Sequence, residues 1–143
     1  MKPVRGFSLI ELMVVVAIAA ILASIAVPTY RDYVMRGKLA EAFTMLASQR
    51  VKMEQFYQDL RTYDGACAAG TVAPPPTGKY FTYVYNINDQ TYTLTATGMA
   101  SEGMPGFAFT IDQSNNRATT GVHTGWTAPS PNNCWTRSKD GKC

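Results

Sequence analysis

The sequence predicts an α+β protein in which one long N-terminal α-helix packs on an antiparallel sheet of about four strands. Three observations lead to this expectation. An almost uninterrupted apolar run lies near the N-terminus, apolar residues then continue at helical spacing, and alternating segments follow between residues 80 and 122. At 143 residues, the chain has the length of one ordinary domain.

The N-terminal segment has the length and composition of a membrane-spanning helix. About 20 residues counted from Phe7 are nearly all apolar, enough to cross ~30 Å of hydrocarbon. In lipid the backbone must satisfy its own hydrogen bonds, so we expect a helix despite the many valines and isoleucines. Lys2 and Arg5 precede the run and favour a cytoplasmic N-terminus.

An ordinary secretory signal peptide is the alternative explanation of this segment. Cleavage would then follow Ala26, where Ser24-Ile25-Ala26 offers small residues at the required spacing. Glu11 opposes this interpretation, because an ionised carboxylate inside a membrane segment costs roughly 2.5–3.5 kcal/mol on insertion scales. The helical pattern also continues beyond Pro28, which should kink the helix rather than end it.

The residues after Pro28 predict an amphipathic helix that ends near residue 61, and then a sheet. The apolar stripe of the helix consists of Leu39, Phe43, Leu46, Met53, Phe56, Tyr57 and Leu60. A loop with Pro74-Pro75-Pro76 follows. We expect strands near 80–85, 91–97, 107–111 and 117–122, with turns near 86–90 and 113–116. One face of this sheet can cover the stripe.

The residues do not assemble into a recognisable catalytic or metal site. We find no Ser/His/Asp or Cys/His grouping, no phosphate-binding glycine loop and no paired carboxylates, and therefore expect no enzyme, no metal and no cofactor. Asp112-x-Ser114-x-Asn116 resembles a calcium loop only superficially, because the later glycine and glutamate are missing. His123 has no cysteine or acidic partner nearby. The net charge of +3 gives the whole chain no strong bias toward nucleic acid.

The segment Gly6-Phe7-Ser8-Leu9-Ile10-Glu11 resembles the processing site of type IV pilins and related pseudopilins. It combines a short basic leader, Gly-Phe, a hydroxyl residue and a glutamate at the fifth position after the cleavage point. The resemblance is close over residues 1–60, which include Pro28-Thr29-Tyr30-Arg31-Asp32-Tyr33. Further along, Tyr92-Thr93-Leu94-Thr95-Ala96 and Phe109-Thr110-Ile111-Asp112-Gln113 are similar to sheet segments of the PilE-like minor pilin branch.

The resemblance implies a processing pathway and a pilin fold. A prepilin peptidase would cut between Gly6 and Phe7, and Phe7 would then be N-methylated. The implied parts are a cleaved leader (1–6), a long helix (7–61, with 7–28 in the membrane or the filament core) and a globular head (62–143) with a C-terminal cysteine loop.

Glu11 and Pro28 are the residues we expect to matter for assembly. A lone buried carboxylate needs a cation, and after cleavage the amine of Phe7 in a neighbouring subunit supplies one. Such a pair sets the register of stacked helices more than it adds stability, because both charges are desolvated.

The resemblance predicts a minor structural subunit of a type IV pilus that supports adhesion, twitching motility or DNA uptake. The implied partners are other pilin subunits, the prepilin peptidase, the bacterial inner membrane before assembly, and DNA or host surface receptors. A DNA-binding receptor subunit of the pilus and a type II secretion pseudopilin are the alternatives that the sequence leaves open.

Three cysteines suggest one disulfide and one leftover thiol. Pilins typically carry a disulfide-bounded loop near the C-terminus, and Cys134-Trp135 resembles that region. We expect Cys134 to pair with Cys143, and we leave open a pairing of Cys67 with either of them.

The segment between these two cysteines is basic and carries a tryptophan. Arg137, Lys139 and Lys142, with Trp135 beside them, could contact DNA through phosphate attraction and stacking. A solvated loop is the simpler expectation, because three cations make a small footprint.

Overall fold

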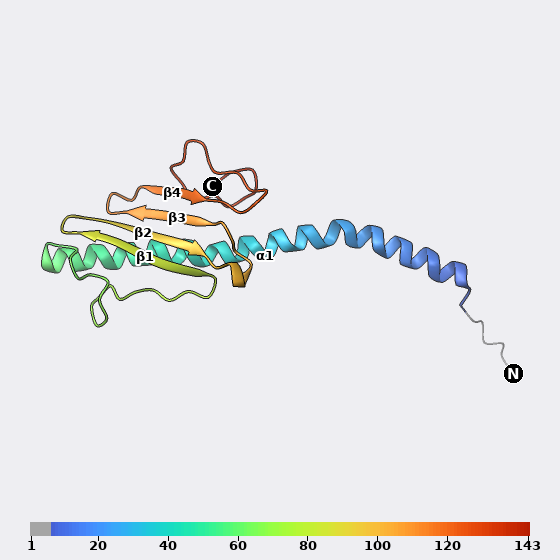
Figure 1. Ribbon diagram of the computed structural model, residues 1–143, viewed down its shortest axis with the longest axis horizontal. Coiled ribbons are helices and arrows are strands. Elements are labelled where there is room, and N and C mark those ends of the chain that lie inside the picture. The colour runs from blue at the N-terminus through green and yellow to red at the C-terminus, as the bar shows by residue number, and fades with distance from the viewer. Residues whose placement is uncertain (1–6) are drawn as a thin grey trace. The chain divides into compact units, whose positions relative to one another are not determined.

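The computed structural model describes residues 7–143, which form one long helix and a four-stranded antiparallel sheet (Figure 1). Helix α1 spans Leu9–Leu60. The strands are β1 (Phe81–Asn88), β2 (Thr91–Gly98), β3 (Ala108–Asp112) and β4 (Arg117–Gly121), and they lie in this order across the sheet. The predicted fold class is thereby confirmed. The chain divides into two compact units, Met1–Val34 and Met35–Cys143, which we describe separately.

Pro28 lies inside α1 and does not end it, as predicted. Its missing N–H removes one bond of the helix, and nearby hydroxyls bond to carbonyls of the same stretch. Thr29 Oγ1 donates to the carbonyl of Ile25 at 2.9 Å, and Ser24 Oγ donates to that of Ile21 at 2.7 Å. Neither acceptor is the carbonyl of Ser24, which loses its helical donor at Pro28, so these bonds do not replace the missing one.

The core of the unit Met35–Cys143 lies between the second half of α1 and one face of the sheet. The helix contributes Leu39, Ala42, Leu46, Met53 and Phe56, and the strands contribute Phe81, Tyr92, Leu94, Ala96, Phe109 and Ile111. Buried and more exposed residues alternate along the strands, so that one face of the sheet packs on the helix. The helical stripe therefore has the packing role expected from its spacing.

Two positions on the helix differ from the predicted stripe. Leu60 is the last residue of α1 and is 59% exposed, so it lies beyond the reach of the sheet. Gln49 is 1% exposed although it is polar. Its Nε2 donates to the carbonyls of Ala73 and Pro74 at 3.0 and 3.1 Å, which fixes the proline-rich loop to the helix.

The first hairpin is tighter than the sequence predicts. The predicted turn at 86–90 is too long, because β1 continues to Asn88, which pairs with Thr91 and leaves only Asp89 and Gln90 in the turn. Asn86 and Asn88 are exposed, and a strand tolerates polar residues on its solvent side. A short 3₁₀ helix at Ala100–Glu102, which the sequence pattern did not indicate, connects β2 to β3.

Alkaline pH should destabilise the unit Met35–Cys143 through its buried tyrosines. Burial raises the pKa of Tyr63 and Tyr85 to about 12, and it also raises the pKa of Tyr83 and Tyr92. The hydroxyls of Tyr63 and Tyr92 donate to Oε1 of Glu54 at 3.1 and 3.2 Å, bonds that deprotonation would remove.

Because these folded-state pKa values lie above 10, the stabilisation is complete below pH 10 and is lost as the pH rises toward 12. We expect the Tm of the chain in detergent micelles to hold up to about pH 10 and then fall as tyrosinate absorbance appears. Titration of all tyrosines near pH 10 with no loss of Tm would contradict this account.

Candidate functional site

The processing motif begins helix α1 with a cap. Gly6 lies outside the described residues, and Phe7 is exposed. Ser8 Oγ accepts a hydrogen bond from the N–H of Glu11 at 3.2 Å, and the Ser8 carbonyl accepts one from the N–H of Leu12, also at 3.2 Å. This is the N-cap arrangement, and Ser8-x-x-Glu11 has the spacing of a capping box. The spacing was readable from the sequence, but its meaning as a cap was missed.

Glu11 therefore lies in the first turn of a helix, among exposed apolar side chains of the same helix. A carboxylate is favoured in the first turn because the helix dipole is positive there. The cap orients the backbone at Glu11 without consuming the carboxylate, since the bond to Ser8 Oγ comes from the backbone N–H of Glu11.

The segment that follows Glu11 exposes almost nothing but apolar side chains. Every residue of α1 from Leu9 to Tyr30 is exposed, and this stretch contains an 18-residue window with mean hydropathy 2.7, none of it buried. By length and composition α1 can cross a membrane. An apolar surface of this extent needs lipid or other protein surfaces around it.

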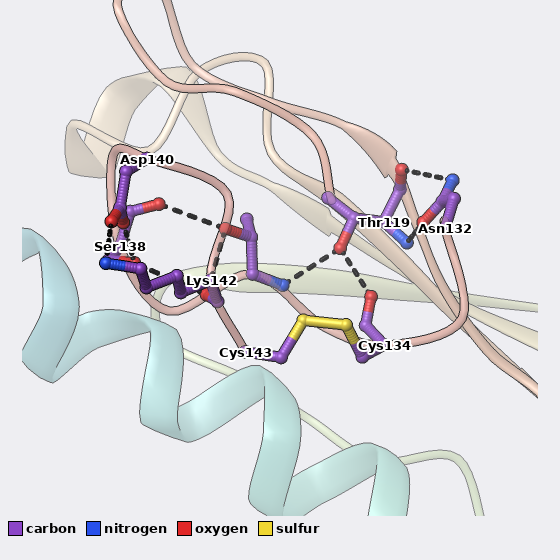
Figure 2. Close-up of a disulfide and its surroundings, with 8 residues drawn as sticks. Thr119, Asn132, Cys134, Ser138, Asp140, Lys142 and Cys143 are labelled. Atoms are coloured by element: carbon purple, nitrogen blue, oxygen red, sulfur yellow. Dashed lines mark hydrogen bonds and ion pairs between the residues drawn. A yellow bond between two sulfur atoms is a disulfide. The ribbon is translucent and has the colours of Figure 1, made fainter. Parts of the chain in front are cut away.

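The C-terminal segment forms a loop closed by a disulfide, which Figure 2 shows. Cys134 is bonded to Cys143, with Cα atoms 6.1 Å apart, and Cys67 remains a free thiol. The structure thus has the pairing that we preferred. Cys67 is half-buried beside the helix, and burial raises the pKa of its thiol.

Thr119, at the edge strand β4, ties this loop to the sheet (Figure 2). Its hydroxyl donates to the carbonyl of Cys134 at 2.8 Å and accepts from the N–H of Thr136 at 2.9 Å. Its backbone N–H and carbonyl bond to the side-chain amide of Asn132 at 2.8 and 3.0 Å. No sequence pattern signals Thr119 or Asn132, because both act by bonding to backbone groups of distant residues.

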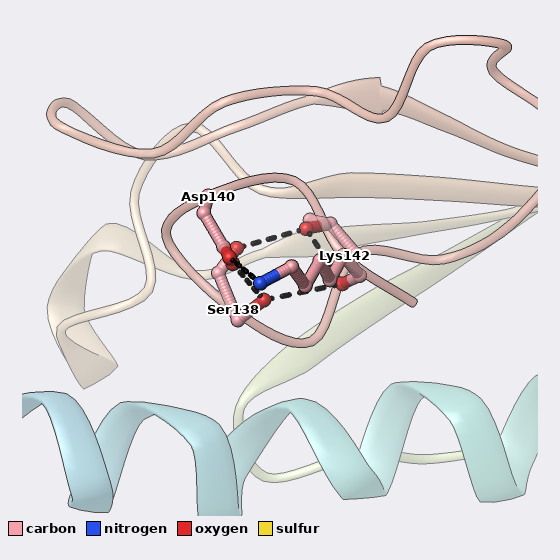
Figure 3. Close-up of polar contacts among 4 residues, drawn as sticks. Ser138, Asp140 and Lys142 are labelled. Carbon is pink, nitrogen blue, oxygen red and sulfur yellow. Dashed lines mark hydrogen bonds and ion pairs between the residues drawn. The ribbon is translucent and has the colours of Figure 1, made fainter.

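Inside the loop, two of the charged residues pair with each other, as Figure 3 shows. Lys142 Nζ lies 2.7 Å from Asp140 Oδ2, and Ser138 Oγ donates to the same carboxylate. The bond from Lys142 holds the pKa of Asp140 at about 2. The charge of Lys142 is therefore largely balanced within the loop. Arg137 and Lys139 are exposed on its surface.

Trp135 cannot stack on DNA, so this part of the less favoured DNA-contact alternative is wrong. Trp135 is 4% exposed, and its Nε1 donates to the carbonyl of Thr110 at 2.8 Å. Its ring lies parallel to that of Phe43, with centroids 5.4 Å apart, and the guanidinium of Arg117 lies 4.8 Å from its centroid. Both faces are covered by the protein, so no base can stack there.

Asp112 and His123 have structural partners in the head. Asp112 accepts hydrogen bonds from the N–H and the side-chain amide of Asn116, at 2.9 and 2.8 Å, which closes the turn between β3 and β4. His123 Nδ1 lies 3.0 Å from the carbonyl of Pro105, and its ring stacks on Phe107.

Comparison with known proteins identifies the family. A family described as type IV minor pilin ComP, DNA uptake sequence receptor, matches residues 28–104, and the prokaryotic N-terminal methylation motif matches residues 1–27. The chain therefore belongs to the type IV minor pilin family. The matched region ends before the cysteine loop, so the basic residues of that loop lie outside it.

Individual relatives agree with this assignment. The fimbrial protein EcpC of Eikenella corrodens is 43% identical over 76 residues, which cover 53% of this chain and 50% of that protein. The type IV major pilin protein PilE1 of Neisseria gonorrhoeae is 34% identical over 97 residues, covering 68% and 59%. The matches thus span about half to three-fifths of these relatives.

A solved structure supports the fold alone. The non-core minor pilin PilV of Neisseria meningitidis superposes with a TM-score of 0.53 at 18% identity. The superposition covers 65% of this chain and 93% of that one.

Removing the hydroxyl of Thr119 should loosen the cysteine loop. Thr119→Val would leave the carbonyl of Cys134 and the N–H of Thr136 without their partner, at a cost of roughly 2 kcal/mol in the free energy of unfolding. Chemical denaturation in detergent micelles measures this cost. Thr120→Val is the matched control, because Thr120 is exposed, and equal stability of the two variants would contradict the anchoring role.

Proposed function

We propose that this chain is a minor structural subunit of an extracellular type IV pilus, held in the bacterial inner membrane as a precursor before assembly. A prepilin peptidase cuts between Gly6 and Phe7, and the chain then joins other pilin subunits through α1. The observation that carries this proposal is the exposed apolar surface of α1 from Leu12 to Val27, directly after Glu11, whose backbone N–H is capped by Ser8. The match to the N-terminal methylation motif supports the same processing route.

Glu11 has a specific task in this proposal. Inside a filament core its carboxylate is removed from water, and a desolvated charge is stable only beside an opposite charge. Cleavage at Gly6 creates a new amine at Phe7, four residues before Glu11. A neighbouring subunit shifted along the filament can bring its Phe7 amine to Glu11, and only one axial shift makes this pair.

A minor pilus subunit agrees better with these observations than either a secreted domain or a type II secretion pseudopilin. A secreted domain cut after Ala26 would lose the apolar first part of a helix that continues to Leu60. A type II secretion pseudopilin is disfavoured because the matching relatives are fimbrial and pilin proteins. Adhesion and twitching motility are further roles that the same filament could support.

DNA reception is the second function that a specific observation favours. The family that matches residues 28–104 is described as a DNA uptake sequence receptor. Arg137 and Lys139 are exposed on the cysteine loop, whereas the charge of Lys142 is largely balanced by Asp140. Such cations attract the phosphates of DNA. Binding of this kind needs no catalytic step, so the proposed subunit is a binding protein and not an enzyme.

Glu11→Val should block assembly without blocking processing. The variant keeps the Gly6-Phe7 junction and an apolar helix, so leader cleavage should proceed, but the pair with the Phe7 amine is lost. We expect an immunoblot to detect the variant in the membrane fraction and to find it nearly absent from sheared filaments. Ser8→Ala, which alters the cap and keeps the carboxylate, is the control. Incorporation of Glu11→Val at the level of that control would refute the role.

Charge reversal in the cysteine loop tests the DNA-receptor function. With Arg137, Lys139 and Lys142 changed to glutamate, we expect full-length protein in detergent micelles to lose at least about tenfold in affinity for duplex DNA in a gel shift. The contacts of Arg137 and Lys139 become repulsive, and Asp140 loses the cation that balances it. Lys52→Glu, on the exposed face of α1, is the control for a single charge reversal outside the loop. Absent binding by the unaltered chain would refute the function itself.

A further inference from the structure

A groove runs beside the second half of α1, within the unit Met35–Cys143. It consists of two adjoining hollows of about 430 and 550 Å³ that share Phe43, Thr44 and Arg137. The first hollow begins at Arg36, and the second reaches Val51. From Arg36 to Val51 the helix rises about 22 Å, so the groove is long enough for about six base pairs of duplex DNA at about 3.4 Å each.

The lining of this groove is positively charged. Arg36 lies on the helix, Arg117 on β4 and Arg137 on the cysteine loop, so three separate elements each contribute one guanidinium. Among the described residues, none that lines either hollow is acidic. A groove with this charge attracts an anion that extends along it.

Two of these guanidiniums are held at the ends of an aromatic column. Arg117 lies 4.8 Å from the ring centroid of Trp135, Trp135 stacks on Phe43, and Arg137 lies 5.7 Å from the centroid of Phe43. Contact with these rings positions the two guanidiniums without a carboxylate partner, and a guanidinium can bind a phosphate through two N–H groups. The ring contact also limits the side-chain entropy that binding would remove.

Four of the helix residues that line the groove are small. They are Ala40, Thr44, Ala47 and Ser48. Because these side chains are short, a bulky polymer can come close to the helix backbone and still reach the guanidiniums on either side.

We propose that this groove is the phosphate-binding surface of the chain for DNA, with Arg36, Arg117 and Arg137 contacting the backbone. The inference rests on the DNA-receptor function proposed above and assigns it a surface along α1, beyond the cysteine loop. We assign these arginines to the DNA backbone, because no asparagine, glutamine or carboxylate lines the groove in the described part of the chain and the ring of Trp135 is already covered.

This assignment has a measurable signature in salt dependence. A guanidinium that neutralises one phosphate contributes about 0.9 to the slope of log K against log salt concentration. Loss of such a contact weakens all sequences alike. Arg36→Gln should therefore lower the slope by about one unit and weaken binding to different duplexes by the same factor of roughly three to ten.

The test uses the full-length chain in detergent micelles and fluorescein-labelled DNA duplexes of two unrelated sequences. Fluorescence anisotropy at several salt concentrations gives Kd and slope for Arg36→Gln and Arg137→Gln. Lys52→Gln is the matched control, because Lys52 is exposed on the same helix and lines neither hollow. Arg36→Lys, which keeps the charge, should restore most of the affinity.

The outcomes separate this proposal from the broader function. Equal Kd and equal salt-dependence slope for Arg36→Gln, Lys52→Gln and the unaltered chain would refute DNA binding by the groove. The receptor function would still stand. No binding by the unaltered chain would overturn both. Unchanged DNA binding together with loss of Arg36→Gln from sheared filaments would also overturn the proposal, and would make the groove a contact between subunits.

Discussion

The packing of one helix face on one sheet face is the interaction on which the rest of the head depends. Within the described residues, the buried face of α1 between residues 35 and 60 is covered by the strands and their loops, and α1 in turn covers the apolar face of the sheet. Once this layer forms, Gln49 fixes the proline-rich loop, and Thr119 on β4 fixes the cysteine loop. The surface features of the head, including its basic loop and its groove, follow from where this layer positions the loops.

The same helix meets a different requirement in its first half. From Leu9 to Val27 its side chains are almost all apolar and exposed, and nothing within the described residues covers them. A surface that suits hydrocarbon also suits the close packing of identical helices. This property is what the proposed transfer of the precursor from a membrane to a filament requires. In the proposed function Glu11 distinguishes these two environments, because lipid offers its carboxylate no cation and a neighbouring cleaved subunit would offer one.

Much of the fold could be predicted from the sequence because it follows from periodicity. The spacing of Leu39, Leu46 and Met53 indicated the buried helix face, and the alternation around Tyr92 indicated a half-buried strand. The length of the first hairpin turn could not be predicted, because asparagines are typical of turns and are also tolerated on an exposed strand. Trp135 was misjudged because the sequence does not reveal which side chains cover its ring. The groove arises from three distant segments and has no signature in the sequence.

The N-terminal sequence of the chain recovered from cells tests the central claim most directly, because retention of the apolar helix decides location, assembly and display together. Mass spectrometry of the protein from sheared filaments and from membranes gives this result. The account predicts a mature chain that begins with N-methylated Phe7 and retains Glu11. A mature chain that begins at Val27 would contradict it, since the apolar helix and its carboxylate would then be absent from the working protein.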